Sequence, residues 1–171
     1  GESMAIAVRI ARAHTNRDTI AFCGYHGWTD WYLATNLKNK NGLNDHLLAG
    51  LEPRGVPKGL SGTIRPFHYN KLEELEQIVK DADGKLAAVV MEPIHGVQPD
   101  KGFLEGVRAI ADRIGAVLVF DEISIGWRLA WGGAHLRFGV MPDMAVFSKA
   151  MSNGYPMAAI LGRREVMQAA Q

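Results

Sequence analysis

Two charged residues follow apolar segments of the sequence. Asp121 comes directly after the run at residues 116–120, and Lys149 comes, after one serine, beyond the run at residues 144–147. Moving a charge out of water is costly unless a partner or a ligand compensates for it. The placement therefore indicates a ligand site built from a carboxylate and an amine. The alternative is that both side chains simply leave the buried segment and reach water.

Polar and aromatic residues also follow two other apolar runs. The sequence Gly-Tyr-His-Gly-Trp (24–28) comes after residues 20–23, and Glu92 with Pro93 comes after residues 87–91. In open parallel sheets, ligands bind beyond the carboxyl ends of the strands. If these runs are parallel strands of one sheet, an aromatic ring, a histidine, two carboxylates and a lysine converge on one edge.

The elements that must position these residues can be predicted from the pattern of apolar residues. Continuous apolar runs are typical of strands covered on both faces, and helical patterns lie between them. This order predicts an α/β fold, a mostly parallel sheet of about six strands with helices on both faces. The expected strands are residues 20–23, 63–68, 87–91, 116–120, 144–147 and 158–161, and the expected helices are residues 4–13, 28–37, 71–80 and 102–114.

Individual residues refine these elements. Pro66 favours an edge position for its strand because proline cannot donate to a sheet ladder. Asn70 is expected to cap the helix that follows it, and Ile6, Ile10 and Ala13 recur at helical spacing in the first expected helix. Residues 38–62, with Leu47, Leu48 and Leu51 as their apolar cluster, form a long connection, which is often functional or a surface excursion.

Composition excludes several classes of protein. The 171 residues carry a net charge of +1 with scattered basic residues, so neither nucleic acid nor an anionic membrane is an expected partner. The lone Cys23 cannot form an internal disulfide, and no His or Cys residues have metal-ligand spacing. These features favour a reducing, cytoplasmic location and no metal, and the histidines other than His26 are expected to be structural or exposed. No apolar run is long enough to cross a bilayer.

Five motifs in order resemble those of the class III aminotransferases, which are fold-type-I pyridoxal-phosphate (PLP) enzymes. They are Gly-Tyr-His-Gly-Trp (24–28), Met-Glu-Pro (91–93), Phe-Asp-Glu-Ile-Ser-Ile-Gly-Trp-Arg (120–128), Gly-Val-Met-Pro-Asp-Met (139–144) and Ser-Lys-Ala-Met-Ser-Asn-Gly-Tyr-Pro (148–156). The spacing of 28 residues from Asp121 to Lys149 is also similar to that of the family. Within the family, the sequence most resembles the glutamate-1-semialdehyde aminomutase branch and relatives described simply as class III aminotransferases.

The resemblance implies a role for each matching residue. Lys149 would form a Schiff base with PLP and shuttle a proton, and Asp121 would keep the ring nitrogen of the cofactor protonated. Tyr25 would stack on one ring face, and Ile123 would pack on the other. His26 and Gly27 would shape the turn at Tyr25, Glu92 would lie near the site, and Gly1 would begin the phosphate-binding helix. We list the expected site as Lys149, Asp121, Tyr25, His26, Gly27, Ile123, Glu92 and Gly1.

The resemblance also implies what lies outside this sequence. The chain begins at Gly1-Glu2-Ser3, inside the family's phosphate turn, and ends in a helix-like stretch. Residues 1–171 are therefore expected to be part of the PLP-binding large domain, truncated at both ends and without the small substrate domain. The full-length protein would be a homodimer acting on an amino donor and a keto or aldehyde acceptor.

Departures from the family pattern leave the reaction open. Ser124 stands where many members carry a glutamine that bonds the ring oxygen of the cofactor, and Val97 stands where the aminomutases have an asparagine. Amino transfer between two molecules is the expected reaction, with intramolecular transfer by an aminomutase as the alternative. Two other functions remain: an inert folded core, because the ends are missing, and an ATPase whose Walker B strand would be residues 118–122, although the chain has no P-loop.

Overall fold

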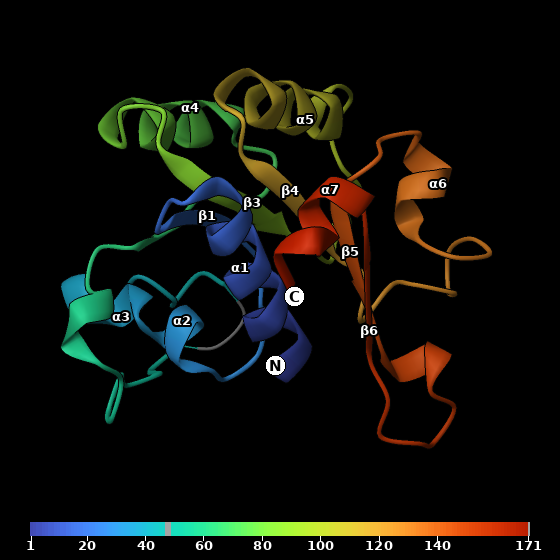
Figure 1. Cartoon of the computed structure of the whole chain (residues 1–171), viewed down its shortest axis with the longest axis horizontal. Coiled ribbons are helices and arrows are strands. Elements are labelled where there is room, and N and C mark those ends of the chain that lie inside the picture. The colour runs from blue at the N-terminus through green and yellow to red at the C-terminus, as the bar shows by residue number, and fades with distance from the viewer. Residues whose placement is uncertain (47–48, 171) are drawn as a thin grey trace.

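The fold centres on one sheet with the strand order β2-β1-β3-β4-β5-β6 (Figure 1). In this computed structural model, which describes residues 1–46 and 49–170, the first five strands are parallel and β6 runs antiparallel to β5. The strands are β1 (Thr19–Cys23), β2 (Ile64–Pro66), β3 (Leu86–Met91), β4 (Val117–Asp121), β5 (Met144–Phe147) and β6 (Ala159–Gly162). The predicted six-stranded, mostly parallel sheet is thus confirmed.

Helices cover both faces of this sheet. On one face, α1 (Glu2–Thr15) packs over β3, β4 and β5; on the other lie α4 (Leu72–Asp81) and α5 (Phe103–Ile114) (Figure 1). The shorter helices are α2 (Asp30–Leu33), α3 (Thr35–Lys38), α6 (Ala134–Phe138) and α7 (Arg164–Met167), with single 3₁₀ turns at Lys58–Leu60, Lys149–Met151 and Gln168–Ala170.

The core has two parts because successive strand residues point to opposite faces. Ile20 and Phe22 of β1 join the cluster under α1, whereas Ala21 and Cys23 join the cluster under α4 and α5. All six residues of β3 are buried. This burial explains why the central strands appear in the sequence as continuous apolar runs rather than as alternating ones.

One arginine ties the amino-terminal edge of the sheet together. The Arg17 guanidinium donates through Nη1 to the main-chain oxygens of Leu86 at 3.0 Å and Ile114 at 2.7 Å. It therefore links the start of β3 to the end of α5, at the edge opposite to the one where the candidate functional residues lie. Backbone oxygens at a helix end need such partners because no further turn supplies them.

Several local predictions were wrong or fall outside the described residues. The helix expected over residues 28–37 is two short helices that divide at Ala34. Asn70 does not cap α4: it adopts a left-handed conformation, with φ of 64°, and its side chain binds the backbone of Asp100 instead. Leu47 and Leu48, the centre of the expected apolar cluster, lie outside the described residues.

The two edges of the sheet differ. Strand β2 lies at an edge, as Pro66 predicted, but it spans only three residues, Ile64–Pro66, rather than the expected 63–68. Edge strand β6 has no residue that is fully buried, and Leu161 on it is 57% exposed. Among the residues that the structure describes, no helix has both the length and the apolar character needed to span a bilayer.

Candidate active site

Lys149 lies at the first turn after β5, at the carboxyl edge of the sheet. Its Nζ donates a hydrogen bond to Ser124 Oγ at 2.7 Å. Its backbone is left-handed, with φ of 46°, a conformation that is uncommon for a residue with a side chain. Unusual backbone geometry of this kind is often found at functional sites, where the surrounding structure imposes it.

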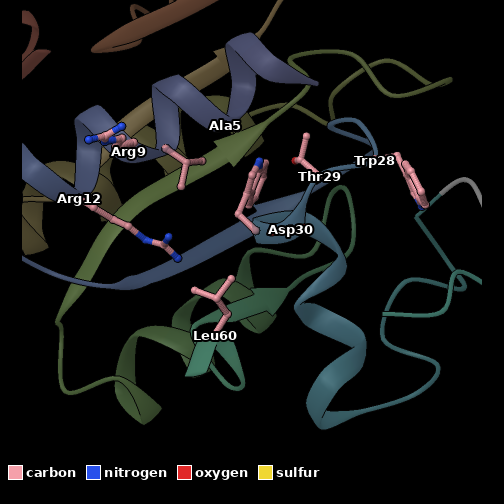
Figure 2. A pocket seen from close by; sticks show the side chains of 9 residues that line it. Ala5, Arg9, Arg12, Trp28, Thr29, Asp30 and Leu60 are labelled. Carbon is pink, nitrogen blue, oxygen red and sulfur yellow. The ribbon is translucent and has the colours of Figure 1, made fainter. Parts of the chain in front are cut away.

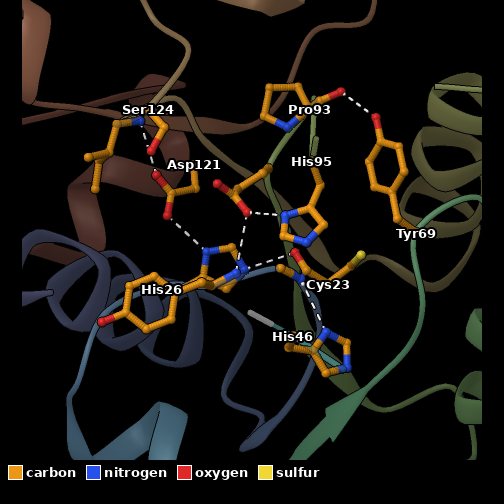
Figure 3. A network of polar contacts seen from close by, with 12 residues as sticks. Cys23, His26, His46, Tyr69, Pro93, His95, Asp121 and Ser124 are labelled. Atoms are coloured by element: carbon orange, nitrogen blue, oxygen red, sulfur yellow. Dashed lines mark hydrogen bonds and ion pairs between the residues drawn. The ribbon is translucent and has the colours of Figure 1, made fainter. Parts of the chain in front are cut away.

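Asp121 is the last residue of β4, so its carboxylate is fixed by the sheet itself. The side chain is buried, and Oδ1 accepts a hydrogen bond from the Ile123 amide at 3.0 Å. Oδ2 lies 2.8 Å from Nδ1 of His26 (Figure 3). Because β4 and β5 are parallel neighbours with Asp121 paired to Val146, the carboxylate and the turn bearing Lys149 share one edge.

His26 has an acceptor at each ring nitrogen. Its Nε2 lies 3.0 Å from the main-chain oxygen of Cys23, which can only accept, so Nε2 carries a proton. The contact between Nδ1 and Asp121 then needs a second proton. His26 and Asp121 therefore share one proton across a buried contact, with side-chain exposures of 0% and 5%.

Glu92 fixes the main chain that carries Tyr25. Its Oε2 accepts from the Tyr25 amide at 3.3 Å and lies 2.6 Å from Nδ1 of His95. Gly24, with φ of 104°, leaves room for this carboxylate, because a Cβ there would lie 2.5 Å from Glu92 Oε2. The Tyr25 ring packs edge-on against Tyr32, with centroids 5.6 Å apart. The carboxylate thus supports the aromatic residue rather than standing free.

The turn at Gly27 meets the start of α1. Gly27 has φ of 94°, and a Cβ on it would lie 2.5 Å from the Cα of Gly1. Gly1 occupies the N-cap position of α1 without a side-chain cap. The first amides of a helix have no intrahelical acceptor and favour an anion. The close approach therefore brings an anion-binding helix start beside the Tyr25–Gly27 turn, at the edge that carries Asp121.

Glu122, the neighbour of Asp121, faces away from this arrangement. Its fully buried carboxylate accepts from the amides of Ala134 at 2.8 Å and His135 at 3.1 Å, and lies 2.9 Å from the His135 ring. It therefore caps α6. Asp121 and Glu122 end the segment considered above as a possible Walker B strand. Asp121 contacts His26, and Glu122 binds the first amides of α6. Among the described residues, no group of three His, Cys, Asp or Glu side chains could hold a metal ion.

His46 binds the backbone of the turn at Gly24. Its Nδ1 accepts a hydrogen bond from the Gly24 amide at 3.5 Å, and its ring stacks on His68 with centroids 5.5 Å apart. Burial, with a smaller contribution from the charge of His68, lowers the pKa of His46 to about 4. A protonated Nδ1 could not accept from Gly24, so the neutral ring is the one that fits this contact.

This contact predicts an acid-dependent loss of stability. Because the pKa of His46 is about 6.5 in the unfolded chain and about 4 in the folded one, its contribution is complete above pH 6.5. That contribution is lost as the pH falls through 4. In urea titrations between pH 7 and pH 4, the variant His46→Gln should lose less unfolding free energy than the wild type. Equal losses in the two proteins would contradict the assignment.

A separate pocket of about 570 Å³ lies along α1 (Figure 2). Its lining does not include Lys149, Asp121 or Tyr25, so it is distinct from the edge described above. It is lined by Ala5, Val8, Arg9, Arg12, Trp28, Thr29, Asp30, Trp31 and Leu60.

The structure brings His26 and Ile123 into contact with Asp121, Tyr25 with Glu92, and Gly27 close to Gly1, whereas Lys149 contacts Ser124 and none of the other expected site residues. Sequence reasoning missed three supporting residues: Ser124 as the partner of Lys149, His95 beside Glu92, and His46 under Gly24. The three-residue spacing from Glu92 to His95 is a signal that could have suggested one of these pairs. No comparable signal links the other two pairs, because their members lie more than 20 residues apart.

The chain is similar to known proteins in sequence and in fold. The family model described as aminotransferase class-III matches residues 1–171. A curated 3-aminobutyryl-CoA aminotransferase from Cloacimonas acidaminovorans (strain Evry) is 38% identical over 98% of the chain. A solved transaminase with PLP bound superposes with a TM-score of 0.81 at 29% identity over 97% of the chain. A glutamate-1-semialdehyde aminomutase from Pseudomonas aeruginosa PAO1 gives 0.75 at 25% identity over 95%.

The chain spans only part of these relatives. It covers 38% of the length of the 3-aminobutyryl-CoA aminotransferase, 39% of the PLP-bound transaminase and 36% of the aminomutase. The match to the family model nevertheless runs over its whole length. With the lysine, the buried carboxylate and the glycine turn at one sheet edge, the chain belongs to the class III aminotransferase family.

Proposed function

We propose that residues 1–171 are part of the PLP-binding large domain of a longer enzyme, whose small substrate domain lies outside this sequence. The coverage of 36–39% of three relatives supports this division. The single sheet with helices on both faces accounts for one domain. The activity therefore belongs to the full-length protein, and the chain alone is expected to bind PLP weakly and to show no turnover.

The residues at the carboxyl edge fit PLP. The cofactor carries an aldehyde, a ring nitrogen and a phosphate, and the edge offers a group for each. Lys149 supplies an amine, and Asp121 supplies a carboxyl group that His26 holds in place. The start of α1 at Gly1 supplies amides for the phosphate.

The remaining residues would hold the flat ring. Tyr25 would stack on one face and Ile123 would pack on the other, which is consistent with their partial burial beside the core. Gly27 permits the close approach of the turn to Gly1, and Glu92 fixes the Tyr25 main chain. These four residues therefore shape the site, and the chemistry falls to the amine and the buried carboxylate.

The protein's own groups determine where protons are held. PLP, when bound, supplies an electron sink that makes a proton next to the substrate nitrogen easier to remove. Asp121 would hold a proton on the ring nitrogen through a charge-assisted hydrogen bond. Lys149, as a neutral amine, would accept the substrate proton and return it. The observation that carries this function is the placement of the Lys149 turn and the buried Asp121 carboxylate at the carboxyl ends of the neighbouring strands β5 and β4.

The reaction we propose is transfer of an amino group between an amine or amino acid and a keto or aldehyde compound. The 38% identity to a 3-aminobutyryl-CoA aminotransferase supports it. The alternative is intramolecular transfer, as in the glutamate-1-semialdehyde aminomutase branch. Ser124, in place of the glutamine that many aminotransferases carry, favours that alternative, whereas Val97, in place of the aminomutase asparagine, disfavours it.

We also propose that the full-length protein is a cytoplasmic homodimer. The homodimer is what the resemblance to the family implies, and the exposed side chains of Trp131, at 93%, and Tyr155, at 79%, are available to such an interface. The cytoplasmic assignment rests on the single, buried Cys23, which needs no oxidising environment.

A product assay distinguishes the two reactions. Full-length protein loaded with PLP should convert an amino donor to a free keto product, and a keto acceptor should sustain turnover. The donor panel should include 3-aminobutyryl-CoA and short β- and ω-amino acids. Residues 1–171 alone, which should give no product, serve as the control. If the panel yields rearranged amine but no keto product, the aminomutase alternative is correct.

A further inference from the structure

The amine of Lys149 has a hydroxyl as its partner rather than a carboxylate. Nζ donates to Ser124 Oγ at 2.7 Å. Among the residues that the structure describes, no carboxylate lies within ion-pair distance of this amine. Asp121, only three residues before Ser124, contacts His26 instead. The amine is therefore held without an opposite charge.

A hydroxyl suits an amine that must change its protonation state. It accepts a hydrogen bond from an ammonium group, and after rotation it donates one to the lone pair of a neutral amine. A carboxylate can only accept, so it would favour the ammonium form. Ser124 can thus keep Lys149 in place in both forms.

Both partners are held by their own backbones. The main-chain oxygen of Ser124 accepts from Nη1 of Arg128 at 2.8 Å, which closes the turn after β4. The main-chain oxygen of Lys149 accepts from the Ser152 hydroxyl at 2.9 Å and from the Ser152 amide at 3.1 Å. The contact between Ser124 and Lys149 therefore joins two anchored turns on neighbouring strands.

We propose that Ser124 is a positioning residue for Lys149, which holds the amine at the place where it captures the cofactor aldehyde. This proposal rests on the proposed function. It also gives Ser124 a role different from that of the glutamine in related sequences, because the hydroxyl contacts the lysine of the protein itself.

Two rates measured on full-length protein stripped of PLP test this role. The first is capture of added PLP, followed by absorbance in a stopped-flow instrument. The second is acylation of Lys149 by a small N-hydroxysuccinimide ester, mapped by mass spectrometry. Ser124→Ala should slow capture by about five-fold, the size expected for one hydrogen bond. The same variant should accelerate acylation, because a small reagent in solution needs no positioned amine and the amine has lost its partner.

Matched variants separate positioning from damage to the fold. Ser124→Thr keeps the hydroxyl and should restore both rates. Ser148→Ala removes a hydroxyl next to Lys149 that binds Met157 instead, and it should leave both rates unchanged. Unchanged rates in Ser124→Ala, or equal slowing of both rates in Ser124→Ala and Ser148→Ala, would overturn the proposal. If the wild type captures no PLP, the proposed function fails, and acylation alone then decides whether Ser124 binds the amine.

Discussion

Lys149→Ala in the full-length protein is expected to abolish covalent attachment of PLP and to reduce the rate of amino transfer by more than about 10²-fold. One general acid–base group usually contributes about 10²–10⁴-fold, and loss of the covalent link to the cofactor adds to this effect. Lys149→Arg should be equally inactive, because arginine keeps the charge but is never a neutral amine at working pH. The measurement is borohydride reduction of the PLP complex, peptide mapping, and the rate of keto product formation.

The control for this prediction is another lysine of the same chain. Lys101 lies exposed in the turn before α5, and Lys101→Ala should retain both labelling and activity. If the wild-type label maps to a different lysine, the assignment of Lys149 is wrong. The residues to be checked are Lys38, Lys58, Lys85 and Lys101.

Asp121→Ala is expected to leave the protein folded but to slow turnover by roughly 100-fold or more, the effect of removing one charged partner in a closed site. The carboxylate would otherwise keep a proton on the ring nitrogen of the cofactor. The substitution also leaves the His26 ring without its acceptor, so some loss of stability is expected as well. Steady-state rates and thermal melting, measured on the same samples, separate the two effects.

Two further variants sharpen this result. Asp121→Asn keeps an oxygen for the Ile123 amide but removes the charge, so its rate should fall nearly as far while its stability falls less. Glu122→Gln alters the adjacent buried carboxylate, whose contacts are with α6, and should reduce stability more than turnover. Near-normal turnover of Asp121→Ala would mean that another residue contacts the ring nitrogen.

The sheet could be predicted because its central strands are buried on both faces. Residues 87–91 and 116–120 are continuous apolar runs; the structure extends the first by one residue, to Leu86, and shifts the second by one residue, to Val117–Asp121. The shift of β4 matters for the site, because it places the carboxylate on the strand itself. The antiparallel direction of β6 could not be predicted, since its short sequence is compatible with either direction.

The positions of Asp121 and Lys149 after buried strands could be predicted from the sequence, but the contacts of the candidate site residues could not. Strand-end positions indicated Asp121 and Lys149, since a charge after a buried run needs an explanation. The pairing of His26 with Asp121 joins residues 95 positions apart, and nothing local in either segment specifies it. For Asn70, a local signal was present but misleading. Asparagine favours helix caps, yet this side chain binds the backbone of Asp100 in the loop before α5.

The two sheet edges differ in how they would behave toward other chains. Pro66 has no backbone N–H to donate from edge strand β2, and the strand is only three residues long. Both features reduce its ability to pair with another strand. The sequence of β6, Ala-Ile-Leu-Gly, has neither a proline nor a charge, and its outer side pairs with no strand of this sheet. An unpaired apolar edge strand can pair with a strand of another chain. When residues 1–171 are produced alone, we therefore expect aggregation to begin at β6 and not at β2.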